Sequence, residues 1–312
     1  MQTIGIDYDE KYLRCGRIQN TDKPEFVKLK QFSADNKGIK SMESWLGECG
    51  DDHSDIVIGI TVSDVIGASL AYRLSKQGYT IAPLTGWSVF QAYLESRKRR
   101  QPAEVAATLA ITKRQTYTPL SEACLQLRSE LFEREITRVN LQQNEAHNEK
   151  FTGQAFDFLM QLTANAMNKH EEHLEETDRK IADLISTNPE FKRDFDLLKT
   201  IPGMDDLAAQ SLVFFAHAYP AEDAHHFASC LGLDDGSKLD QSDYRVHDLR
   251  VVRGPLYSAA KTALEQIPAI RAFGERLSQK GKAENVITVA AMHKLARMAY
   301  AVIHSKQAYR EA

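Results

Sequence analysis

Cysteine is scarce in this chain, with four residues in 312 and none of them in C-x-x-C spacing. The scatter argues against a cysteine zinc site or a disulfide framework and favours reduced thiols. Long apolar runs are missing too, since no stretch approaches the roughly 18 apolar residues of a membrane helix. The first residues, 2–7, are typical of a strand and not of a signal peptide. We therefore expect a cytoplasmic protein without a membrane partner.

An excess of positive charge is also absent. The chain has 39 Lys and Arg against 43 Asp and Glu, a formal net charge of −4. That balance argues against a protein that holds nucleic acid by bulk charge, but it allows local basic groups. The 43% hydrophobic and 26% charged residues are those of an ordinary soluble chain. Its length suffices for two domains and a connector.

Short apolar segments separated by turn residues fill the first part of the chain. Three consecutive strands are predicted over residues 2–8, 11–18 and 25–32. A helix over 36–47, a buried strand over 55–61, a helix over 65–77, a strand over 80–84 and further helices follow. A meander followed by alternating helices and strands is the order of an RNase H-like fold. We expect an α/β domain of this RuvC-like type over residues 1–116, and an all-α remainder.

Residues 117–190 change character, because apolar residues recur there at steps of three and four. The first series is Leu120, Cys124, Leu127 and Leu131, and a second runs from Met160 to Leu184. Heptad spacing on two helices with a break near 144–153 predicts a coiled-coil stalk and a homodimer through it. Two alternatives stay open, namely a self-contained helical arm and helices packed on the C-terminal core.

The segment 197–209 predicts a helix-hairpin-helix inside a helical domain over residues 191–312. Pro202-Gly203 breaks an apolar helix, and Gly203 can adopt a positive φ that leaves backbone N–H groups accessible. The following helix N-terminus favours a phosphate. Alternatively the segment is only a turn between helices, and Asp205 caps the second one.

The residues after this hairpin resemble the C-terminal half of the bridge-RNA-guided insertion-sequence recombinases, the family that includes the Piv invertases. The likeness rests on residues 228–233, a polar segment holding Ser242, the cations and small residues of 250–260, and the ending 289–298. It covers residues 195–306 well and the first 115 more loosely. The layout is also similar to that of Nop-domain box C/D proteins and of the Tas effectors of tandem interspaced guide RNA (TIGR) systems. It implies a helical Nop- or transposase-like domain that binds RNA or DNA.

The resemblance also implies which catalytic carboxylates should be present. The family places an Asp on the first strand, which Asp7 matches, and a Glu at the end of the fourth, where this chain has Gly59-Ile60-Thr61 and no Glu. Its two later Asp positions fall on Pro102 and Val105. Two-metal catalysis needs such oxygen ligands, so we expect no catalytic residue, no Mg²⁺ and no other metal or cofactor, with Asp7 vestigial. The alternative is a rearranged site of Asp7, Asp64 and Glu104.

Ser242 matches the family's nucleophilic serine within a residue or two. The following residue is Asp243 where the family has Gly, and the flank is acidic. A serine needs a base or a metal to become a nucleophile. A surface-loop serine is therefore the default, and Ser242 acts with Mg²⁺ only in the alternative of an active recombinase.

Three basic groups are the candidates for contact with nucleic acid, beside the hairpin. The predicted contact residues are Arg97, Lys98, Arg99, Arg100, Lys199, Gly203, Tyr244, Arg245, His247, Arg250, Arg253, Lys280 and Lys282. The first run follows an aromatic helix with Trp87, Phe90 and Tyr93. The alternatives are a solvated charged face, cations that complement a helix dipole and tyrosines packed in the core. Adjacent His225 and His226 do not converge on one metal, because neighbours on a helix diverge.

Taken together, these patterns predict a nuclease-deficient protein that binds a structured guide RNA and targets DNA by base pairing. The first alternative is an active metal- and serine-dependent RNA-guided recombinase or transposase. A scaffold without RNA, in which the stalk assembles other proteins, is the second.

Overall fold

The computed structural model describes residues 2–18, 26–50, 52–96, 100–112, 117–148, 157–234, 245 and 248–311. The chain forms two compact units, residues 1–125 with 239–247 and residues 126–238 with 248–312. The first unit holds a five-stranded mixed sheet with helices, and the described part of the second is helical. The predicted α/β plus all-α composition is therefore confirmed.

The sheet of the first unit has the order β3-β2-β1-β4-β5. Strands β1 (Gln2–Tyr8), β2 (Tyr12–Ile18) and β3 (Phe26–Ser33) form an antiparallel meander. Strands β4 (Ile56–Thr61) and β5 (Thr80–Leu84) run parallel to β1. Each lies within a residue of its predicted range, because turn residues and apolar runs fix strand bounds locally.

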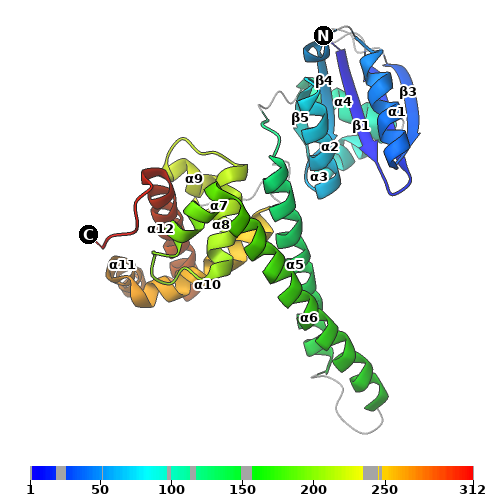
Figure 1. Cartoon of the computed structure of the whole chain (residues 1–312). Coiled ribbons are helices and arrows are strands. Elements are labelled where there is room, and N and C mark those ends of the chain that lie inside the picture. Colours follow the sequence, from blue (N-terminus) through cyan, green and yellow to red (C-terminus); the bar gives the residue numbers. More distant parts are fainter. Residues whose placement is uncertain are drawn as a thin grey trace. The chain divides into compact units, whose positions relative to one another are not determined.

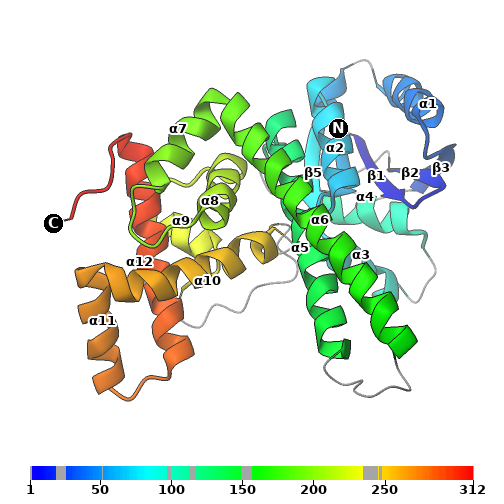
Figure 2. The same cartoon turned by 60° about the horizontal axis from the view of Figure 1, so that its bottom comes forward.

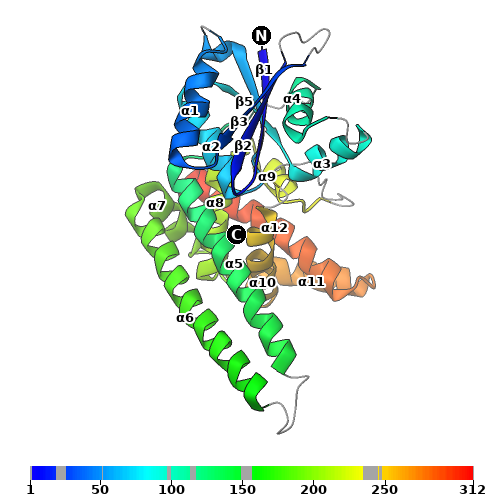
Figure 3. The same cartoon turned by 90° about the vertical axis from the view of Figure 1, so that its right-hand side faces the viewer.

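Helices cover both faces of this sheet (Figure 3). On one face, α1 (Asn36–Gly47) and α2 (Val65–Lys76) share a core with Ile4 and Ile6 of β1. On the other face, α4 (Pro102–Thr112) lies directly on the strands. A Cβ on Gly5 would lie 2.0 Å from the Ala103 carbonyl oxygen, so only glycine permits this approach. The helix α3 (Gly86–Glu95) packs beside α4, and a short 3-10 turn, η1 (His53–Asp55), precedes β4.

Two long helices, α5 (Glu122–Asn148) and α6 (Asp157–Thr187), lie side by side (Figures 1 and 3). Arg134 of α5 binds Asp178 of α6, and Glu133 lies 2.9 Å from Nε2 of His173. The inward side carries buried Leu127, Leu131, Thr177 and Ile181 from the two series with heptad spacing. The two predicted long helices are thus present, while their role as a dimer stalk stays a prediction.

Six further helices make up the rest of what the structure describes of the second unit. They are α7 (Pro189–Leu198), α8 (Asp206–Ala218), α9 (Ala224–Cys230), α10 (Leu249–Gln266), α11 (Pro268–Gln279) and α12 (Glu284–Ser305). Figure 2 shows α12 among its neighbours, and it contacts α7, α9, α10 and α11. Phe214, Phe215 and Phe227 are fully buried beside it in this unit.

By length and composition, α12 is the one helix in the described part of the chain that could cross a membrane. Its apolar side is occupied within the unit, since Met292, Leu295 and Ala299 are buried. A core helix passes the same test of length and composition, so α12 alone is weak evidence for a membrane segment.

Candidate functional site

The carboxyl ends of β1 and β4 define the first candidate site. These strands are parallel and Ile6 pairs with Ile60, so Asp7 and Thr61 come at the same edge of the sheet. Ligands commonly bind beyond this edge of parallel strands. Thr61 has no carboxylate, and its hydroxyl donates to the Tyr8 oxygen over 2.8 Å. Thr61 is therefore a neutral group that is already hydrogen-bonded, and β4 ends without a carboxylate.

Asp7 is paired with a cation from the neighbouring strand. Its Oδ2 lies 3.2 Å from Nη1 of Arg14, the residue opposite it in the β1–β2 register. Arg14 also binds Asp9. Burial raises the pKa of Asp7, and the hydrogen bond and charge of Arg14 oppose that rise without cancelling it. The edge thus holds a partly buried carboxylate that shares its counterion, Arg14, with Asp9.

Asp64 begins α2 as its N-cap. Its Oδ1 accepts from the Gly67 N–H over 2.9 Å, and its Oδ2 accepts from the Tyr8 hydroxyl over 2.6 Å. Burial, together with the Asp64 charge, raises the pKa of Tyr8 well above its ordinary value, so this hydroxyl stays a donor. Both oxygens of Asp64 therefore hold the local fold.

Glu104 stands in the first turn of α4 and has a similar role. Its Oε2 accepts from the Gln101 N–H over 3.1 Å. Val105 is buried against Leu84 and Val89. Over the described ranges, Asp7, Asp64 and Glu104 are not among the groups whose ligand atoms gather closely enough for one ion. The sheet edge does not bring together the rearranged carboxylate set.

An exposed apolar stripe on α3 lies just before the first basic run. Trp87, Phe90 and Leu94 are 50%, 52% and 46% exposed, and the two aromatic rings are 6.4 Å apart. Tyr93 packs instead against the core. Arg97, Lys98 and Arg99 lie outside the described residues, while Arg100 is exposed and reaches Thr108. The sequence marked this helix as aromatic, but periodicity could not tell which rings face outward.

The hairpin residues are engaged within the protein. Gly203 has φ +84°, as predicted, and a Cβ there would lie 2.9 Å from the Ala263 nitrogen of α10. Lys199 donates to the Met204 carbonyl over 2.9 Å and binds Asp206. Asp205 accepts from the Ala208 N–H over 2.8 Å. The alternative that Asp205 caps the second helix is confirmed, so an acid occupies the N-terminus that a phosphate would need.

In the second basic group, one arginine is hydrogen-bonded inside the helical unit and another is exposed to solvent. Arg253 donates to the carbonyls of Leu231 and Gly232 at the end of α9, over 2.7 and 2.6 Å, and burial lowers its pKa. Arg250 is exposed, and Arg245 is half-buried. Ser242, Tyr244 and His247 lie outside the described residues.

The third basic group surrounds the turn between α11 and α12, with Lys280 and Lys282 both exposed. Lys294 stands over the Phe273 ring at 4.5 Å, and Arg276 stands over it at 5.4 Å. Tyr257 is half-buried beneath Lys261. This turn therefore offers exposed cations beside an aromatic ring, an arrangement suited to a nucleic-acid strand.

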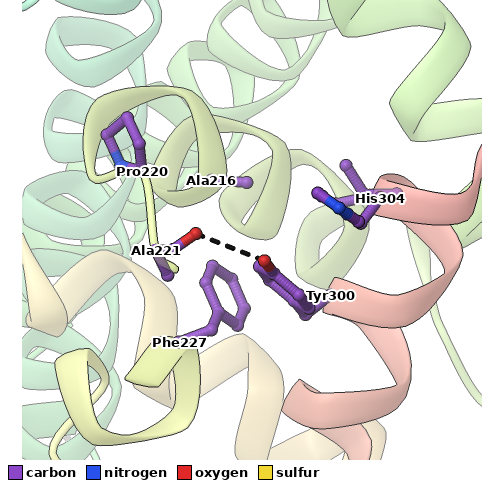
Figure 4. Close-up of a pocket in the computed structure, with 7 residues that line it drawn as sticks. Ala216, Pro220, Ala221, Phe227, Tyr300 and His304 are labelled. Atoms are coloured by element: carbon purple, nitrogen blue, oxygen red, sulfur yellow. Dashed lines mark hydrogen bonds between the residues drawn. The ribbon is translucent and has the colours of Figure 1, made fainter. Parts of the chain in front are cut away.

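A small apolar pocket of about 180 Å³ lies between α9 and α12 (Figure 4). Phe227, Tyr300 and His304 line it, and the Tyr300 hydroxyl donates to the Ala221 carbonyl over 3.2 Å. Tyr300 and His304 stack with ring centroids 5.4 Å apart. The lining is mostly apolar, with Tyr300 and His304 as its polar side chains.

The described residues thus combine an α/β unit that has a carboxylate at the edge of its mixed sheet with a helical unit that carries surface cations. The chain is 30% identical over 142 residues to the pilin gene-inverting proteins of Moraxella bovis and Moraxella lacunata. The match covers 42% of this chain and 44% of each relative, so it spans less than half of their length. No protein-family model matches the chain.

Proposed function

We propose that this protein binds nucleic acid and is a distant relative of DNA-inverting recombinases that has lost the metal-dependent cutting step. The main supporting observation is the sheet edge, where β4 ends in Gly59-Ile60-Thr61 without a carboxylate and Asp7 is paired with Arg14. Two-metal catalysis requires several oxygen ligands around a shared site. The strand order supports an RNase H-like (RuvC-like) domain here, with a Nop- or transposase-like helical domain at the other end of the chain.

In this proposal the chain has three parts, with a sheet domain over residues 1–116, a helical stalk over 117–190 and a nucleic-acid-binding domain over 191–312. The side-by-side arrangement of α5 and α6 supports a stalk through which two copies join. The ligand proposed is a structured guide RNA, which directs the cytoplasmic complex to target DNA by base pairing. Without cutting, the output is occlusion of the target or recruitment of a partner.

The surface proposed for the nucleic acid is the α3 stripe with the cations of 97–100. Exposed rings of Trp87 and Phe90 can stack on unpaired bases, each worth about 1–3 kcal/mol. The neighbouring cations neutralise phosphates, so binding should weaken steeply as salt rises. With a net charge of −4, a few placed cations carry this attraction.

The test is to express the protein with its flanking DNA, sequence co-purifying RNA, and titrate that RNA with variants. Trp87→Ala with Phe90→Ala should lower affinity at least about tenfold. Ile66→Ala is the matched control, because Ile66 is similarly exposed at 61% but lies on α2, outside both the proposed surface and the stalk. The absence of an enriched RNA would remove the guide-RNA proposal, and equal effects of both variants would remove the proposed surface.

An active recombinase is the second candidate function, and retention of Asp7 together with the similarity to gene-inverting proteins favours it. Metal-dependent strand exchange on DNA is the assay. Activity abolished by Asp7→Ala and by Ser242→Ala would establish this candidate and overturn the loss of cutting.

A further inference from the structure

Three side chains from distant parts of the sequence converge at one end of the second unit. They are His225 on α9, Asp234 shortly after that helix, and His293 on α12. One ligand atom from each residue lies within 4.8 Å of the others, and these three are the one such group found over the described ranges. Asp7, Asp64 and Glu104 of the first unit do not form such a group.

The local geometry orients the two imidazoles. Nε2 of His293 lies 3.7 Å from Oδ1 of Asp234, and the rings of His225 and His293 meet edge to face with centroids 5.8 Å apart. Ser229, one turn further along α9, places its hydroxyl 3.3 Å from Nδ1 of His225. A metal-binding histidine commonly engages its other ring nitrogen in this way, which leaves Nε2 of His225 for an ion.

The capped start of α9 fixes the backbone position of His225. Asp223 caps α9 by accepting from the N–H groups of His225 and His226 over 2.7 and 2.8 Å. His226 is turned away from the group, and its Nδ1 accepts from the Glu222 N–H over 3.3 Å. The side chains of Asp234 and His293 are 35% and 22% exposed, so an ion can reach them from solvent.

We propose that His225, Asp234 and His293 form a binding site for one divalent transition-metal ion of the zinc class. Two imidazoles and a carboxylate suit Zn²⁺, Co²⁺ or Ni²⁺ better than Mg²⁺, which prefers oxygen ligands. Tetrahedral bonds of about 2.0–2.1 Å place ligand atoms about 3.3 Å apart. The group must therefore close slightly, which rotation of these side chains permits.

The site has three protein ligands and so leaves one position open to water. The ion joins α9, α12 and the chain just after Leu233 through one ligand from each. It would stabilise this end of the helical unit, because metal bound to the folded state alone adds to its stability. The proposal is independent of nucleic-acid binding, which uses other residues.

The experiment is titration of the full-length, chelator-treated protein with Zn²⁺ by calorimetry and with Co²⁺ by visible absorption. One ion should bind per chain, give the absorption of a low-coordinate Co²⁺ site and raise the melting temperature. His225→Ala and His293→Gln should each weaken binding by more than the ~10–100-fold that loss of a ligand's hydrogen-bond partner costs. Asp234→Asn should act in the same direction.

His226→Ala is the matched control, being the next residue on the same helix with the same surface exposure. It should leave the affinity unchanged. Equal losses in His226→Ala and His225→Ala would indicate loose surface binding and overturn the proposal. The absence of a Zn²⁺ site, or a site abolished by Asp7→Asn and not by His293→Gln, would overturn it too. Failure to bind RNA would leave it intact.

Discussion

Arg128 of α5 and Asp248, immediately before α10, form a buried ion pair. Nε and Nη2 of Arg128 both lie 2.7 Å from Oδ1 of Asp248, and the two side chains are 1% and 0% exposed. The Tyr219 hydroxyl donates to the other carboxylate oxygen. The first turns of α5 are thereby linked to the start of α10 by an ion pair that is buried away from water.

Arg128→Ala is expected to lower the free energy of unfolding by about 3–5 kcal/mol, because it leaves Asp248 buried without its counterion. Chemical denaturation at neutral pH measures the change. Arg134→Ala is the control, since its partner Asp178 is 47% exposed and such pairs contribute at most about 1 kcal/mol. Similar losses in both variants would show that burial does not govern the strength of the pair.

Replacing Asp7 by Asn should stabilise the protein at pH 7. Burial raises the pKa of Asp7 despite Arg14, so the ionised form is less favourable in the folded than in the unfolded chain. Chemical denaturation of the variant and the natural protein at pH 7 measures the gain.

Asp9→Asn should change the stability in the opposite direction. Hydrogen bonds from the Lys11 backbone and from Arg14 lower the pKa of Asp9, so removing its charge should decrease stability. A loss of stability in Asp7→Asn would mean that the fold requires the Asp7 charge.

Gly203→Ala should be strongly destabilising. A side chain at φ +84° costs about 1–2 kcal/mol, and contact with the Ala263 nitrogen adds about 1–3 kcal/mol of overpacking. Gly281 is the control, with φ +73° and open space around its Cβ position. Gly281→Ala should show the backbone cost alone, and equal effects would exclude a packing role for Gly203.

Asp194 should make stability depend on acid pH. Burial raises its pKa, but hydrogen bonds from His217 and Arg193 outweigh that and lower the pKa below its ordinary value. The ionised carboxylate therefore stabilises the fold above the unfolded pKa of about 3.9, and this contribution is lost as the pH falls through the folded pKa.

Unfolding of Asp194→Asn across pH 2–7 measures this contribution. The variant should be less stable than the natural protein at pH 7, and the difference should shrink toward about pH 2–3. Asp196→Asn is the control, because Asp196 is 56% exposed beside Lys192, and it should stay within about 0.5 kcal/mol. A difference for Asp194→Asn that does not change with pH would contradict the role of ionisation.

The amino-acid sequence by itself determined the elements and their caps. Helix 36–47 and strand 80–84 lie at their predicted bounds, and the positive φ of Gly203 and the capping by Asp205 were both foreseen. These features depend on a few neighbouring residues, because periodicity, turn chemistry and capping are local. The lack of a Glu in Gly59-Ile60-Thr61 follows from comparing the sequence with the pattern of the family that it resembles.

Only the tertiary structure decided which side chains are available for function. Lys199 and Arg253 are used inside the helical unit, whereas Trp87 and Phe90 are exposed on α3. His225 meets His293 although their spacing gives no sign of it. The contacts of Arg253 and His293 join segments far apart in the chain, and a single sequence records residue types but not which distant surfaces come together.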